Sequence, residues 1–137
     1  AAYPVMFTQW ALRPDSGGAG EHRGGVGAVY EIEALAPGRT EVALLGERGR
    51  FAPFGVAGGA DGALNHFTWG SAGETPPMAS KIVGVSIAQG ERVRLESPGG
   101  GGWGDPAARP MEAIARDIRL GYVSAEAAFR DYGKRAS

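Results

Sequence analysis

The chain has 137 residues with no cysteine, 24 glycines and 9 prolines, and its 14 basic and 15 acidic residues leave a formal charge of −1. Glycine at well over twice its usual share of about 7% is the strongest compositional signal, whereas 43% apolar and 21% charged residues are ordinary for a folded domain. The composition therefore excludes a disordered chain, a disulfide framework, a cysteine-ligated metal cluster and a strongly basic surface for nucleic acid or anionic lipid.

The first part of the chain predicts β-strands. Residues 3–12 (YPVMFTQWAL) carry apolar side chains on both alternating faces, which predicts a strand buried on two sides. Residues 26–33 alternate between apolar and more polar side chains and predict a strand with one wetter face. After a turn at Pro37 and Gly38, residues 40–45 predict its hairpin partner.

Three further strands are predicted downstream. Residues 64–69 are a short strand candidate, and residues 82–87 are β-branched and apolar enough for a central strand. A turn at Gln89 and Gly90 leads into a last strand over residues 92–96.

The hydrophobic period then changes from 2 to 3.6, which predicts helices. One helical face carries Met111, Ile114, Ile118 and Tyr122. A helix docked through this single apolar stripe is therefore predicted, with Gly121 ending it. A second short helix is predicted between a cap at Ser124 and a stop at Gly133.

The predicted fold class is α+β: a mainly antiparallel β domain with glycine-rich loops, followed by a pair of short C-terminal helices. A chain of this length makes one domain, so we expect a single domain over residues 1–137. Its parts are a β-rich region (1–97), a glycine loop (98–106) and a helical tail (107–135). No apolar run approaches the roughly 20 residues that span a bilayer and no secretion signal is evident, so we expect a soluble, cytoplasmic protein without a membrane partner.

Residues 97–106 (SPGGGGWGDP) match the G-x-G-x-x-G spacing of dinucleotide-binding loops. No strand follows to complete a Rossmann unit and no Gly-Lys-Ser/Thr follows, so neither nucleotide interpretation is favoured. The favoured interpretation is a tight turn in which backbone passes close to backbone, with Asp105 capping the next helix and Pro106 at its first position. The alternative is close approach of a ligand or partner subunit to Gly99, Gly100, Gly101 and Gly102.

Residues 15–25 (DSGGAGEHRGG) concentrate polar side chains among glycines that permit unusual backbone angles. The candidate catalytic residues are Arg23, His22 and Asp15. Ser16 and His22 could form a nucleophile and base, although the spacing fixes no geometry. Arg23 is either a donor to a substrate carboxylate or phosphate or, as is favoured, a bridge that pins the loop. The predicted substrate or interface loops are completed by Ser16, Gly24, Gly25, Gly99, Gly100, Gly101, Gly102 and Asp105.

A metal site made by this chain alone is not expected. His22 and His66 lie in different segments, no His-x-x-x-His or His-x-x-Glu-His pattern occurs, and the carboxylates show no ligand-like clustering. The aromatic residues are not interleaved with basic ones as a nucleic-acid stacking surface requires, so we expect them in core and interface.

Four motifs carry a family resemblance. They are residues 15–27 (DSGGAGEHRGGVG), 47–59 (ERGRFAPFGVAGG), 97–106 (SPGGGGWGDP) and 115–133 (ARDIRLGYVSAEAAFRDYG). Taken in this order they resemble the C-terminal part of hydantoinase B proteins, a family that includes the B-type halves of 5-oxoprolinases and the large subunits of acetone and acetophenone carboxylases. The resemblance covers essentially the whole chain.

The resemblance implies an ATP-dependent enzyme in which a hydantoinase A-type partner uses ATP to activate a cyclic amide, lactam or ketone, and a B-type component completes hydrolysis or carboxylation. This chain would be a small subunit or fragment that completes the B-type component of a hydrolase acting on a hydantoin, 5-oxoproline or lactam. The alternatives are a component of a ketone carboxylase and a non-catalytic assembly module.

The implied partners are a hydantoinase B-type N-terminal subunit, the A-type ATP-using subunit and a small-molecule substrate. No cofactor is expected on this chain alone. ATP with magnesium would belong to partner subunits, and a divalent metal there stays open, because the metal-ligand region of the carboxylases lies in the N-terminal portion that is absent here. We expect the chain to associate obligately with larger subunits and to be inactive alone, since at least one neighbour of strand 3–12 should come from outside the chain.

Overall fold

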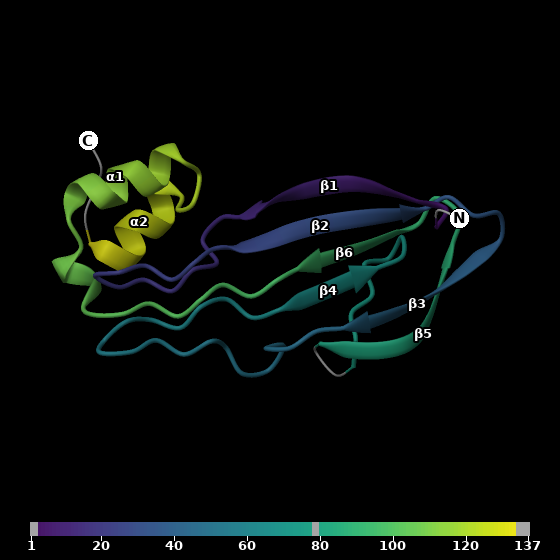
Figure 1. The fold of residues 1–137 in the computed structure, drawn as a ribbon, viewed down its shortest axis with the longest axis horizontal. Coiled ribbons are helices and arrows are strands. Elements are labelled where there is room, and N and C mark those ends of the chain that lie inside the picture. The colour runs from purple at the N-terminus through teal and green to yellow at the C-terminus, as the bar shows by residue number, and fades with distance from the viewer. Residues whose placement is uncertain (1–2, 78–79, 134–137) are drawn as a thin grey trace.

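The computed structural model describes residues 3–77 and 80–133. The elements occur in the order β1 (Val5–Arg13), β2 (Gly27–Ala34), β3 (Arg39–Leu45), β4 (His66–Trp69), β5 (Lys81–Ala88), β6 (Arg92–Glu96), the 3₁₀ turn η1 (Pro106–Ala108), α1 (Met111–Arg119) and α2 (Ala125–Tyr132). The molecule is elongated: strands gather at one end, the helix pair lies at the other, and long extended segments run between them (Figure 1). Antiparallel strands followed by two short helices confirm the α+β class.

Four strands form one antiparallel sheet in the order β1-β2-β6-β4. On one face of β2, Glu31 lies opposite Gln9 of β1 and Arg94 of β6. Because side chains alternate along a strand, the neighbouring residues Tyr30 and Ile32 point to the other face, which is apolar. The strands predicted at residues 26–33, 64–69 and 92–96 are therefore confirmed, with ends that move by no more than two residues.

β3 and β5 form a separate two-stranded antiparallel sheet. The predicted hairpin between residues 26–33 and 40–45 is therefore wrong. The turn is present, with Gly38 at a φ of +81°, but β2 already has β1 and β6 on its two sides and offers no edge to β3. The prediction of a central strand at residues 82–87 is also wrong, because β5 pairs only with β3. Alternation specifies which face of a strand is apolar and leaves its neighbour undetermined.

The two sheets enclose the larger hydrophobic core. Its buried members are Ala34, Leu44, Phe67, Trp69, Val85, Ile87 and Val93. They come from β2, β3, β4, β5 and β6, so the β3–β5 sheet covers the β2-β6-β4 part of the larger sheet. β1 contributes no residue to this core.

β1 departs from its prediction. Its composition predicts a strand buried on two sides, yet Phe7 is 56% exposed and Trp10 is 72% exposed. β1 is an edge strand that pairs only with β2, and every one of its residues is exposed or half-buried. The burial that the apolar composition predicts is thus not supplied by the described residues of this chain.

The helix pair builds a second, smaller core. Its buried members are Ala19, Ile114, Val123, Ala127, Ala128 and Tyr132. The predicted apolar stripe of the first helix docks through Ile114, which is 1% exposed, whereas Met111 at its start is 41% exposed. No helix in residues 3–77 and 80–133 is long and apolar enough to cross a membrane.

The predicted helix ends are confirmed, with one shift. The Ser124 hydroxyl accepts a hydrogen bond from the Ala127 amide at 3.1 Å, and Gly121 and Gly133 adopt the left-handed conformation that ends a helix. Asp105 caps the short η1 turn, while α1 begins only after Pro110. Residues 134 and 135 of the predicted helical tail lie outside the described residues.

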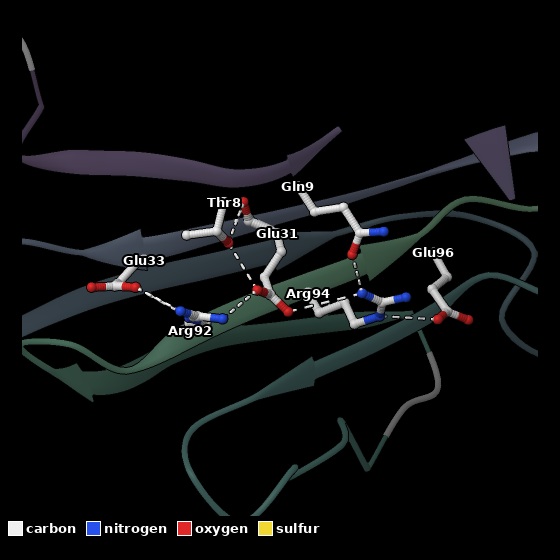
Figure 2. A network of polar contacts seen from close by, with 7 residues as sticks. All are labelled: Thr8, Gln9, Glu31, Glu33, Arg92, Arg94 and Glu96. Carbon is white, nitrogen blue, oxygen red and sulfur yellow. Dashed lines mark hydrogen bonds and ion pairs between the residues drawn. The ribbon is translucent and has the colours of Figure 1, made fainter. Parts of the chain in front are cut away.

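Charged side chains of β2 and β6 form a network of ion pairs on the polar face of the four-stranded sheet (Figure 2). Arg92 pairs with Glu31 at 3.0 Å and with Glu33 at 3.1 Å, and Arg94 pairs with Glu96 at 3.1 Å. β1 joins the network, because its Thr8 hydroxyl donates to Glu31 at 2.8 Å and its Gln9 side chain accepts from Arg94 at 2.6 Å. Each of the three carboxylates in this network, those of Glu31, Glu33 and Glu96, has a guanidinium partner.

Candidate functional site

The two glycine-rich loops singled out in the sequence lie side by side with a third segment. We call this arrangement the glycine bundle and define it as residues 15–27, 53–63 and 97–104. Backbone hydrogen bonds tie the segments together: the Gly18 amide donates to the Gly100 carbonyl at 2.8 Å, Gly102 donates to Ala60 at 2.9 Å, and Ala60 donates to Ala19 at 2.7 Å. In Figure 1 these are extended segments that lie between the strands at one end of the molecule and the helix pair at the other.

Glycine is required in the bundle because neighbouring backbones leave no room for a Cβ atom. A Cβ on Gly102 would lie 2.6 Å from the carbonyl carbon of Ala19 and 2.7 Å from the carbonyl oxygen of Gly18, closer than real Cβ contacts come. Added Cβ atoms on Gly24, Gly99 and Gly101 would also overlap backbone atoms of another segment. The prediction that backbone passes close to backbone is therefore confirmed, and both partners belong to this chain.

The tight turn predicted in residues 97–106 is wrong, and the glycines of residues 15–25 do not use the positive φ angles that glycine permits. Of the glycines in residues 17–27 and 99–104, Gly104 alone has a positive φ, of +76°. Most of these glycines therefore serve close packing of extended segments. Gly99 and Gly101 of the dinucleotide-like spacing approach the backbone of Ser16 and Phe54, so this chain itself occupies the space a phosphate would need.

The two candidate aspartates act as caps. One Asp15 carboxylate oxygen accepts a hydrogen bond from the Ser124 amide at 2.7 Å, at the N-terminus of α2. The left-handed backbone of Asp15, with a φ of +60°, is uncommon for a non-glycine residue. Asp105 accepts from the Ala107 amide at 2.9 Å. Both carboxylates thus satisfy backbone donors at the start of helical turns.

Ser16 is buried, with 2% of its surface exposed. Its hydroxyl donates to the Arg13 carbonyl at 2.6 Å and accepts from the Gly27 amide at 2.8 Å. No hydrogen bond joins it to His22 in the described part of the chain. The hydroxyl therefore has the partners of a structural group, and nothing in this arrangement activates it as a nucleophile.

Arg23 belongs to a partly buried charge cluster around Asp117 that connects the glycine bundle to α1. Its Nε donates to Asp117 at 3.0 Å, and Arg109 donates to the same carboxylate oxygen at 2.7 Å. The Arg23 guanidinium lies 5.2 Å from the centre of the Tyr122 ring, and Arg109 lies 5.9 Å from that of Tyr132. This geometry supports the pinning interpretation of Arg23, because the guanidinium is already held by Asp117.

Asp117 is the residue that sequence reasoning missed. It is only 5% exposed although it is charged. A signal was present: Asp117 directly precedes Ile118 and lies three residues after Ile114, so it borders the apolar stripe of a helix. A carboxylate at such a position requires a buried cation.

His22 and Trp103 are exposed residues of the predicted loops and lie next to each other. Their backbones exchange two hydrogen bonds of 2.9 Å, and their rings lie 5.4 Å apart. Trp103 is 49% exposed, and Val56 beside it is 48% exposed. Within residues 3–77 and 80–133 the His22 imidazole makes no hydrogen bond. We call His22, Val56 and Trp103 the His22–Trp103 surface.

This surface offers limited chemistry of its own. An imidazole can donate and accept hydrogen bonds, and an indole offers a flat face for stacking. No groups of three His, Asp or Glu side chains in the described ranges could hold a metal ion. The expectation that this chain alone binds no metal therefore stays a prediction.

Comparison with known proteins gives a consistent set of relatives. The family model "Hydantoinase B/oxoprolinase" matches residues 1–106. The beta subunit of the caprolactamase of Pseudomonas jessenii is 39% identical over 96% of this chain, and the B-type subunit of a putative D-/L-hydantoinase of a Pseudomonas species (strain NS671) is 30% identical over 96%. The chain spans only 23% and 22% of those two relatives.

Solved structures resemble the fold over nearly all of its length. The crystal structure of the ATP-dependent caprolactamase from Pseudomonas jessenii superposes with a TM-score of 0.83 and 32% identity over 98% of this chain and 24% of that chain. A nucleotide-free acetone carboxylase superposes with a TM-score of 0.76 and 22% identity, over 95% of this chain and 21% of that chain. The second likeness concerns the fold alone.

Proposed function

The chain belongs to the hydantoinase B/oxoprolinase family, and from this premise we propose that it is part of the B-type component of an ATP-dependent enzyme that hydrolyses a cyclic amide. The observation that carries the proposal is the 39% identity to the beta subunit of a caprolactamase across 96% of this chain. The proposed substrates are lactams, with hydantoins and 5-oxoproline as related ring amides. In such a reaction ATP and water are consumed and ADP and phosphate are released. The ring C–N bond breaks and its carbonyl carbon becomes a carboxylate, while the nitrogen becomes an amine from a lactam or 5-oxoproline and part of a carbamoyl group from a hydantoin.

Residues 1–137 would act as one unit whose glycine bundle is a rigid scaffold. A scaffold role is supported by the inter-segment backbone hydrogen bonds and by the partly buried Arg23–Asp117–Arg109 cluster, which leave little freedom between sheet and helices. The scaffold would present the His22–Trp103 surface to the substrate passage or to a subunit seam. ATP with magnesium would be held by an A-type partner in the cytoplasm, and the rest of the B-type component would complete the enzyme.

A second candidate is a non-catalytic assembly module. It is favoured by one observation: Asp15, Ser16, Arg23 and Asp105 all have structural partners within this chain. The two candidates make different predictions for His22, because its imidazole has no hydrogen-bond partner in the described part of this chain. His22→Ala should lower turnover of an intact complex at least tenfold if the chain contributes to catalysis, and should leave turnover unchanged if it only assembles the subunits.

The proposed reaction is tested by assaying the protein with its co-purifying subunits. ADP release and ring-opened product are measured with ε-caprolactam, hydantoin and 5-oxoproline, and in parallel with acetone plus bicarbonate. We expect ADP release to require one of the cyclic amides and to match product formation. ADP release that requires the ketone and bicarbonate instead would replace the hydrolase by a carboxylase, and ADP release without any of these substrates would contradict both.

A further inference from the structure

The apolar face of the four-stranded sheet is open beside β1. We call this area the β1 apolar surface and define it by Tyr3, Val5, Phe7, Trp10, Leu12 and Tyr30. Trp10 lies opposite Tyr30 and Phe7 lies opposite Ile32, so these side chains share the face that elsewhere holds the core. Tyr3 is 87% exposed, and Leu12 is 51% exposed. The β3–β5 sheet covers this face over β4, β6 and the end of β2 at Ala34, and no residue of β1 belongs to the core beneath it.

Three aromatic rings on this surface are arranged against each other. The Trp10 and Tyr30 rings stack with centroids 5.3 Å apart, Phe7 meets Trp10 edge-on at 5.7 Å, and Phe7 lies 6.3 Å from Tyr30. Clustered Trp and Tyr side chains dominate the binding energy of protein interfaces. Because these rings are already held by one another, a partner that covers them loses less side-chain entropy than one that must order them.

The exposed surface is continuous with a groove between the two sheets. An open cavity of about 470 Å³ is lined by Tyr3 and Phe7 of this surface and by the core residues Phe67 and Val93. Its lining is mostly apolar. A partner seated on the β1 apolar surface therefore reaches the main hydrophobic core directly.

β1 has two other sides at which a partner could contact it, its polar face and its outer edge. The polar face carries the network of Figure 2, whose carboxylates are paired with guanidinium groups of this chain. The outer edge of β1 has no strand beside it in the described part of the chain. This edge presents unpaired backbone groups over the length of a nine-residue strand, roughly 30 Å.

We propose that the β1 apolar surface is the docking site for the rest of the B-type component, through an apolar region that covers Phe7, Trp10 and Tyr30. This inference rests on the proposed function. The occupant follows from length: the chain spans 23% of the caprolactamase beta subunit and 24% of the chain in the caprolactamase crystal structure, so about three quarters of those polypeptides lie outside the matched part. A stable interface buries about 800 Å² on each partner, and an aromatic cluster beside an apolar groove provides a centre for one of that size.

The contact is tested by photo-crosslinking in the assembled enzyme. Benzoylphenylalanine is placed at Trp10 in one preparation and at Val83 in a control, because Val83 is an equally exposed apolar residue (71%) on β5 outside the proposed surface. We expect Trp10 to crosslink to peptides of the rest of the B-type component and Val83 to give no such product. Crosslinks from Trp10 to an A-type subunit or to a second copy of this chain, or no crosslink at all, would overturn the proposal.

Substitutions provide a second measurement. Trp10→Asp should weaken association with the rest of the B-type component at least 30-fold, because it places a charge in a desolvated contact, while Val83→Asp should change it less than twofold. Equal effects of the two variants would contradict the docking site. ATP-dependent turnover is recorded on the same preparations. If Trp10 crosslinks as expected but no cyclic amide is turned over, the docking site is supported and the proposed function is contradicted. If a cyclic amide is turned over but Trp10 crosslinks to another subunit, the proposed function is supported and the docking site is contradicted.

Discussion

The replacement of Gly102 by alanine tests the close packing of the glycine bundle with the smallest possible change. The added Cβ would lie 2.6 Å from the carbonyl carbon of Ala19, so the two segments must separate. The Gly102 amide and carbonyl also bond to Ala60 and to Val56, each at 2.9 Å. Overpacking costs about 1–3 kcal/mol, and each buried hydrogen bond that is lost costs about 1 kcal/mol or more. We therefore expect the free energy of unfolding to fall by about 3 kcal/mol.

A matched control is available in the same bundle. Gly25 has no atom within 4 Å of an added Cβ and its φ lies outside the left-handed region, so Gly25→Ala should leave the stability unchanged or raise it by about 0.4–1 kcal/mol. Urea unfolding followed by tryptophan fluorescence, together with a thermal melt, measures both variants. A loss of about 3 kcal/mol corresponds to a melting temperature lower by about 10 °C for a chain of this size. Equal stability of the Gly102 and Gly25 variants would refute the explanation of the glycine content.

Three further predictions concern buried polar groups. Asp117→Asn should lower the free energy of unfolding by about 3–5 kcal/mol, because two guanidinium groups lose the buried carboxylate that they share. The control Asp131→Asn removes an exposed ion pair and should cost less than about 1 kcal/mol in the same urea titration. Similar costs for the two variants would contradict a stabilising role of the Arg23–Asp117–Arg109 cluster. Burial raises the pKa of the Tyr132 phenol above its usual 10.0. The neutral phenol is favoured in the folded state, so its contribution to stability should be complete below pH 10 and lost as the pH rises through the raised value. Urea midpoints between about pH 9 and 11.5 measure this loss, which Tyr132→Phe should abolish; a loss that persists in that variant has another source. Ser16→Ala should lower stability by about 1–3 kcal/mol by leaving the Gly27 amide unpaired, with turnover per folded complex unchanged. A hundredfold loss of turnover would restore Ser16 as a nucleophile.

The sequence predicts the elements of this fold better than their neighbours. Strand alternation and helix caps act within a few residues, so β2, β6 and the ends of α2 can be located from the sequence pattern alone. The pairing of β3 with β5 depends on which edges are already occupied, and this is decided only when the whole sheet assembles. The exposed face of β1 also depends on its neighbours. Its apolar pattern predicts burial but does not indicate which chain covers it.

The candidate site shows where residue types alone are insufficient. Glycine runs suggest turns because glycine permits positive φ, but at Gly102 the decisive property is the missing Cβ, which matters only beside another backbone. Arg23 and Ser16 are polar residues in a glycine loop, and such residues are found in active sites and in structural contacts alike. Their partners are Asp117, 94 residues away, and backbone groups at Arg13 and Gly27. The 94 residues between Arg23 and Asp117 leave no local signal of their contact in the sequence.

The most direct test of the central claim is to compare the assembled enzyme with and without this chain. The A-type and remaining B-type subunits are prepared alone and then with residues 1–137 restored, and ATP-dependent ring opening of ε-caprolactam is followed by ADP release and product formation. If the chain completes the B-type component, turnover should be lost by at least 100-fold without it and should return on its addition. Full turnover of the complex that lacks these residues would contradict the account.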